Sequence, residues 1–173
     1  SVLQVFHDAP AWTRSGESAR LPDDLLAVYR FSKDAAESFA GAVGVWQFWN
    51  EHDHIFIRET ADHYASAFKA AALGFRDGGA RAALGSFAHP PGPYAELVLR
   101  NDVLPYTDVY TFHTYADATT NAYTSILKQH LDFFNKWNAA GSTERNASPP
   151  EIWITESGKH FIRTPGASFM EAA

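Results

Sequence analysis

The stretch VGVWQFW, residues 43–49, decides the fold class of this chain. It is too apolar on both faces for a strand that exposes one face to water, because such a strand alternates apolar and polar residues. We therefore expect a strand that is buried on both faces, as in a parallel sheet covered by helices.

Strand-like and helical segments alternate on both sides of this stretch. Apolar, β-branched or aromatic runs predict further strands at 2–6, 81–88, 108–115 and 151–157. Helical spacing of apolar residues predicts helices at 23–40, from the N-cap residue Thr60 to Gly78, at 92–101 and around 123–137. This rhythm is typical of parallel strands joined by crossover helices, so we predict an α/β domain over residues 1–173. An open doubly wound sheet and a closed barrel both fit it.

The composition excludes several classes of function. The 173 residues carry a net charge of −6, which argues against a general nucleic-acid or anionic-membrane surface. No run reaches the roughly eighteen apolar residues of a membrane span. The absence of cysteine rules out disulfides, thiolate nucleophiles and cysteine-bound zinc.

Polar residues gather where three of the predicted strands end. Asn50 and Glu51 follow the strand at 43–49, His113 and Tyr115 end the strand at 108–115, and Glu156 ends the strand at 151–157. Parallel strands end at one rim, where functional groups collect in both candidate architectures. A carboxylate beside a buried strand is costly unless it is paired or used, so we expect the two glutamates to share a site.

Two carboxylates on one rim are what cleavage of a glycosidic bond requires. One, held protonated, gives its proton to the leaving oxygen. The other, ionised, attacks the anomeric carbon or activates a water. The pair therefore predicts a glycoside hydrolase.

The same motifs carry a family resemblance. VWQFWNE (45–51) and IWITESG (152–158) resemble the two catalytic strands of the clan A glycoside hydrolases, which are retaining (β/α)8-barrel enzymes. That clan has its acid/base in an Asn-Glu pair after strand four and its nucleophile as a Glu after strand seven. FHTYA (112–116) is similar to the strand-six element, and VFHDAPAWTR (5–14) to the end of strand three. The xylosidase-like and cellulase-like branches both stay open.

The resemblance implies a role for each matching residue. Glu51 would be the general acid/base and Glu156 the nucleophile of a double displacement that needs no metal or organic cofactor. Asn50 would hydrogen-bond the 2-hydroxyl of the sugar.

Three further residues would complete the pocket for a carbohydrate substrate. The resemblance implies that Tyr115 donates to Glu156 and that His113 shapes the space between the carboxylates. Trp12 is the tryptophan that we expect to serve as a sugar platform, because it stands in a loop at the rim.

The resemblance also sets the expected extent of the fold. It implies a partial (β/α)8 TIM barrel that covers roughly strands three to seven. Strands one, two and eight have no counterpart, and a complete barrel typically needs about 250 residues. We therefore expect the chain to be a fragment of a larger enzyme.

Several alternatives remain beside this hypothesis. EHDH (51–54), with His63, offers metal-ligating side chains, but no recognisable ligand spacing completes them. A nucleotide-binding domain would need a glycine-rich turn between strand and helix, and a serine hydrolase a Gly-x-Ser-x-Gly elbow; neither motif is present. A catalytically inactive carbohydrate-binding relative of the barrel is the main rival. The sugar, the linkage, the localisation and the oligomeric state stay open.

Overall fold

A computed structural model describes residues 2–10, 19–140 and 149–158. In these ranges strands and helices follow each other in the order β1 (Val2–Phe6), α1 (Leu25–Ser38), β2 (Val43–Phe48), α2 (Ala61–Asp77), β3 (Arg81–Phe87), α3 (Pro93–Arg100), a 3-10 turn (Leu104–Tyr106), β4 (Val109–Thr114), α4 (Asn121–Ala140) and β5 (Glu151–Ser157).

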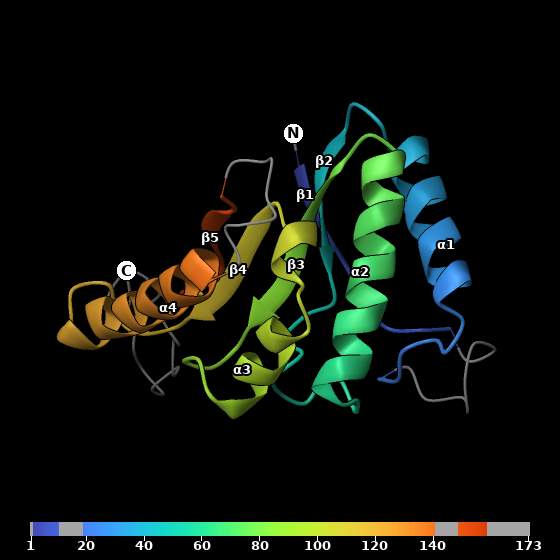
Figure 1. Ribbon diagram of the computed structural model, residues 1–173. Coiled ribbons are helices and arrows are strands. Elements are labelled where there is room, and N and C mark those ends of the chain that lie inside the picture. Colours follow the sequence, from blue (N-terminus) through green and yellow to red (C-terminus); the bar gives the residue numbers. More distant parts are fainter. Residues whose placement is uncertain (1, 11–18, 141–148, 159–173) are drawn as a thin grey trace, which may run out of the picture.

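The five strands form one sheet in the order β1-β2-β3-β4-β5, and every neighbouring pair is parallel. The sheet curls into a half-barrel, with the helices on its outer side (Figure 1). The predicted α/β class, with parallel strands and crossover helices, is thus confirmed. All strand ends fall within a few residues of the predicted ones. Because the strands are parallel, their carboxyl ends share one rim.

β2 is buried on both faces, as its sequence predicts. On the helix side, the ring of Trp46 stacks on Phe75 of α2 at a centroid distance of 5.6 Å, and Phe48 packs against Tyr64 and Phe68. On the concave side, a small apolar layer crosses all five strands. It consists of Leu3, Val45, Ala83, Val109 and Trp153. Apolar residues on both faces are what the interior of a barrel-like sheet requires.

Helices α1 and α2 lie side by side against the N-terminal half of the sheet (Figure 1). Asp24 caps α1 by accepting hydrogen bonds from the backbone N–H groups of Leu26 and Ala27. The two helices approach so closely at Gly74 that a β-carbon there would lie 2.3 Å from the carbonyl oxygen of Tyr29. A glycine at this position therefore permits the helix contact.

Helix α4 is covered less than the other helices. It runs away from the rest of the molecule in Figure 1, and among its described side chains only His130 and Phe134 are fully buried. Trp137, which helical spacing places on the apolar stripe of this helix, is half-buried and packs against the core. Part of the apolar face of α4 thus packs against the sheet, and part of it remains accessible to solvent.

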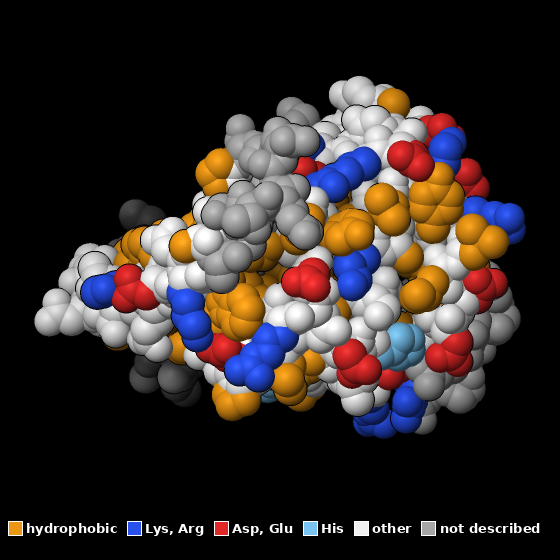
Figure 2. Space-filling view, in the orientation of Figure 1, with side chains coloured by type: hydrophobic (Ala, Val, Ile, Leu, Met, Phe, Trp, Pro, Cys, Tyr) orange, Lys and Arg blue, Asp and Glu red, His pale blue; other side chains and the backbone are white. Residues whose placement is uncertain are grey.

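The surface carries no concentrated charge on the face shown in Figure 2, where acidic and basic side chains alternate. Among the helices in the described ranges, none combines the length and apolar character that crossing a bilayer requires.

Candidate active site

The turn after β2 holds Glu51 in an unusual backbone conformation. Trp49 has φ 71° and Glu51 has φ 42°, both in the left-handed region that side chains other than glycine seldom adopt. The Trp49 side chain is buried, and its Nε1 donates to the carbonyl oxygen of Phe56 at 2.9 Å. Buried packing of this kind is what sustains a strained turn, and such turns cluster at functional sites.

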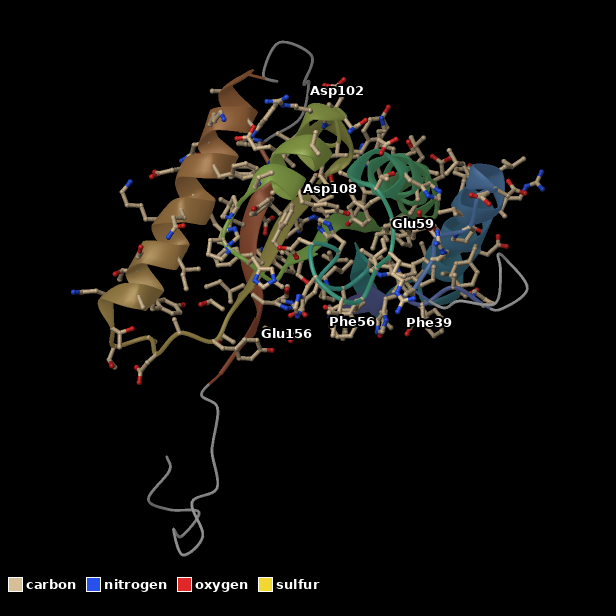
Figure 3. The ribbon with its side chains drawn as sticks, turned by 90° about the horizontal axis from the view of Figure 1, so that it is seen from below. Phe39, Phe56, Glu59, Asp102, Asp108 and Glu156 are labelled. Carbon is tan, nitrogen blue, oxygen red and sulfur yellow. The ribbon has the colours of Figure 1, made fainter. Side chains whose placement is uncertain are left out.

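A β-bulge sets the position of Glu156. Phe112 of β4 pairs with Ile154 of β5, yet the next residue, His113, pairs with Glu156 rather than with Thr155. Bulges re-aim side chains and are common beside active sites. Here the bulge brings His113 and Glu156 opposite each other. Figure 3 shows Glu156 at the end of β5, on the same edge of the molecule as Phe56 from the loop after β2.

His113 lies between the two predicted catalytic carboxylates. Its Nδ1 is 2.8 Å from Oε1 of Glu51, and its Nε2 is 3.6 Å from Oε1 of Glu156. One ligand atom from each of the three side chains lies within 4.8 Å of the other two. The imidazole is buried, Glu51 is largely covered and Glu156 is open to solvent. The site thus has a closed side at Glu51 and an open side at Glu156.

Tyr115 forms a hydrogen bond with Glu156, the solvent-accessible carboxylate of the site. Its hydroxyl donates to Oε2 of Glu156 at 2.6 Å. This hydrogen bond to a carboxylate raises the pKa of Tyr115 to about 12. The phenol therefore stays protonated and remains a donor throughout the range of ordinary enzyme assays.

Asn50 is positioned by residues that the sequence analysis did not single out. Ser86 Oγ, at the end of β3, donates to Asn50 Oδ1 at 3.3 Å. The buried Gln47 in turn donates from Nε2 to Ser86 Oγ at 3.2 Å. A serine near the carboxyl end of the predicted strand 81–88 was the available signal, since that place is on the functional rim.

The histidine next to Glu51 belongs to the core. His52 is 1% exposed, stacks on Tyr64 at a centroid distance of 4.0 Å, and places Nε2 2.7 Å from the carbonyl oxygen of Gly85. Burial lowers the pKa of His52 to about 4, so the ring is neutral at pH 7. Asp53 accepts hydrogen bonds from the backbone N–H groups of Ala88 and His89. Both residues fix the loop that carries Glu51.

The EHDH stretch does not gather its side chains around one point. His54 is exposed and contacts His89, with 3.2 Å between ring nitrogens, while His63 contacts Glu59. Within the described ranges, the one group of three side chains that could share a metal ion is Glu51, His113 and Glu156. Metal chemistry at EHDH itself therefore has no geometric support.

Each ring nitrogen of His113 faces one carboxylate, and its role as donor or acceptor depends on the tautomer. When Glu51 is protonated, its O–H donates to Nδ1, and the ring proton on Nε2 faces the Glu156 carboxylate. When Glu51 is ionised, Nδ1–H donates to it and Nε2 presents a lone pair. The geometry thus lets His113 Nδ1 either accept a hydrogen bond from Glu51 or donate one to it.

The sequence-predicted residues divide into three groups. Glu51, His113, Tyr115 and Glu156 form one connected cluster, and Asn50 stands next to Glu51 with its amide bound to Ser86. Trp12 lies outside the described residues. The catalytic roles themselves stay predictions. A scan against protein-family models gives no match, and a search of curated proteins finds no relative.

Proposed function

We propose that this chain is the catalytic part of a retaining glycoside hydrolase built on a (β/α)8 barrel, with a carbohydrate as substrate. Glu51 acts as the general acid/base and Glu156 as the nucleophile. The single observation that carries the proposal is the cluster of both carboxylates around His113. The five parallel strands would correspond to strands three to seven of the barrel.

The separation of the carboxylates favours the retaining mechanism. One oxygen of Glu51 and one of Glu156 lie within 4.8 Å of each other. Retaining enzymes have carboxyl groups about 5–5.5 Å apart, whereas inverting enzymes need roughly 6.5–9.5 Å to admit a water. Oxygens this close are compatible with the shorter spacing, at which Glu156 attacks the sugar itself.

The surroundings of each carboxylate suit its proposed role. Glu51 is largely covered and contacts one imidazole nitrogen, which can accept its proton in a hydrogen bond until the leaving oxygen takes it. Glu156 is exposed enough to meet the anomeric carbon and accepts a hydrogen bond from Tyr115. In the first step the Glu156 oxygen forms a bond to the anomeric carbon as the bond to the leaving oxygen breaks and Glu51 protonates that oxygen. In the second step Glu51 takes a proton from water, which displaces Glu156 with a second inversion.

Turnover of aryl glycosides by variants tests the proposal. The protein is assayed on a panel of dinitrophenyl and alkyl glycosides, because the sugar is unknown. Glu156→Gln should lose turnover of every substrate. Glu51→Gln should lose roughly 10²- to 10⁴-fold on alkyl glycosides, which need a proton, and much less in the first step with dinitrophenyl glycosides, which do not. Glu151→Gln is the matched control, since Glu151 stands at the other end of β5 and pairs with Arg81.

Rescue by azide distinguishes the two roles. Azide should restore turnover of a Glu51→Gly variant and give a glycosyl azide of retained configuration. With Glu156→Gly it should give the inverted azide, because it then attacks the substrate directly. Sugar binding without turnover in the wild type would support the inactive carbohydrate-binding relative instead.

A further inference from the structure

The Nε2 atom of His113 is buried and has no hydrogen-bond partner among the residues that the structure describes. The side chain is 1% exposed, and Nε2 faces Oε1 of Glu156 at 3.6 Å, beyond hydrogen-bond distance. Buried polar atoms nearly always have a partner, so an unpaired ring nitrogen aimed at a carboxylate indicates a missing ligand.

The other ring nitrogen is held as it is in metal-binding histidines. Nδ1 lies 2.8 Å from Oε1 of Glu51. A histidine that ligates a metal almost always donates its second ring N–H to a carboxylate or carbonyl, which fixes the tautomer and leaves the free lone pair on the ligating nitrogen. Glu51 occupies that place relative to His113.

The distances fit a small divalent ion. Zinc binds imidazole nitrogen and carboxylate oxygen at about 2.0–2.2 Å, so two ligands of a tetrahedral site stand about 3.4 Å apart. The 3.6 Å between Nε2 of His113 and Oε1 of Glu156 needs only a small adjustment. Because Glu156 is open to solvent, water can fill the remaining positions.

We propose that a divalent transition-metal ion such as Zn²⁺ binds between His113 Nε2 and Glu156, with Glu51 supporting the histidine. A nitrogen ligand favours zinc over calcium or magnesium, which prefer oxygen. The proposal does not rest on the glycosidase function. If both hold, the ion is an inhibitor, because it occupies the nucleophile and requires Glu51 to be ionised.

Titration of the 173-residue chain with Zn²⁺, followed by calorimetry, tests this site. A rival site on the described surface is the exposed His54–His89 pair, whose ring nitrogens are 3.2 Å apart. Three proteins are compared: the wild type, Glu156→Gln and His89→Gln. His89 is exposed and the Glu156 side chain is 42% exposed, so both substitutions should leave the fold intact.

The wild type is expected to bind one Zn²⁺ ion at this site. Glu156→Gln should weaken the binding by roughly 10-fold or more, and His89→Gln should leave it unchanged. The proposal is overturned if the wild type does not bind Zn²⁺, or if His89→Gln abolishes binding while Glu156→Gln does not weaken it. No glycoside enters the titration, so its failure would leave the proposed hydrolase activity untouched, and an inactive protein could still bind the ion.

Discussion

The Nδ1 atom of His113 lies 2.8 Å from Oε1 of Glu51, although 62 positions separate the two residues in the chain. The second nitrogen of the same ring faces Glu156. One buried side chain of β4 therefore connects a carboxylate from the loop after β2 with a carboxylate of β5. In the proposed mechanism His113 is a positioning residue that holds Glu51 by a hydrogen bond and faces Glu156 with its other nitrogen.

Replacement of His113 should affect substrates according to their leaving groups. His113→Phe keeps a ring but loses both polar contacts. We expect kcat/KM for alkyl glycosides to fall roughly 10²-fold or more, and that for dinitrophenyl glycosides much less, because only the former need the proton of Glu51. His113→Asn, which retains a polar group, should recover part of the loss. Equal losses on both substrates would indicate a purely structural role.

Removal of the Tyr115 hydroxyl should impair catalysis without unfolding the protein. Tyr115→Phe deletes the 2.6 Å hydrogen bond to Glu156. Hydrogen bonds to charged groups contribute about 1.5–3 kcal/mol, which corresponds to a loss of roughly 10- to 150-fold in kcat/KM. Because Tyr115 is 43% exposed, the free energy of unfolding should change by no more than about 0.5 kcal/mol. Full activity in this variant would remove Tyr115 from the site.

The strands and the residues at their ends could be predicted from the sequence because both depend on local patterns. Apolar runs identify the strands, and parallel pairing places Glu51, His113 and Glu156 on one rim. The bulge that leaves Thr155 without a partner in β4 could not be predicted, since it depends on the pairing of two distant strands. Without it, Glu156 would lie opposite Thr114.

Other features of the site depend on tertiary contacts that no local pattern encodes. The left-handed conformation of Glu51 is imposed by the packing of the turn around Trp49. The stacking of His52 on Tyr64 joins the turn to a helix that begins several residues later. The contact between Ser86 and Asn50 likewise requires β2 and β3 to be neighbours.

The approach of β3 to the strained turn requires a glycine at position 85. A β-carbon there would lie 2.3 Å from the carbonyl oxygen of Phe48 and 2.6 Å from the hydroxyl of Tyr64. Gly85→Ala should therefore lower the free energy of unfolding by about 1–3 kcal/mol or more, measured by urea denaturation. Gly92→Ala is the control, because the nearest atom to its β-carbon would be 4.0 Å away. Similar stability of the two variants would contradict the close approach.

Acid should destabilise the fold through His52. Its pKa is lowered by burial from 6.5 to about 4, so between these pH values the unfolded chain binds a proton that the folded chain does not. The contribution of the neutral ring to stability is complete above pH 6.5 and is lost as the pH falls toward 4, by roughly 3 kcal/mol in all.

Comparison of two variants isolates this effect. Urea denaturation at pH 7 and pH 4.5 should show a smaller loss of stability for His52→Gln than for the wild type. His54→Gln, which changes an exposed histidine, should behave like the wild type. An equal pH dependence in all three proteins would contradict the burial of a neutral His52.

Covalent trapping tests the central claim most directly. An activated 2-deoxy-2-fluoro glycoside of the preferred sugar slows the second step of a double displacement, so the glycosyl-enzyme accumulates and its labelled peptide can be sequenced by mass spectrometry. Our account predicts one sugar on the protein, attached through an ester to Glu156. A label on any other residue, or turnover of the parent substrate with no covalent adduct, would contradict it.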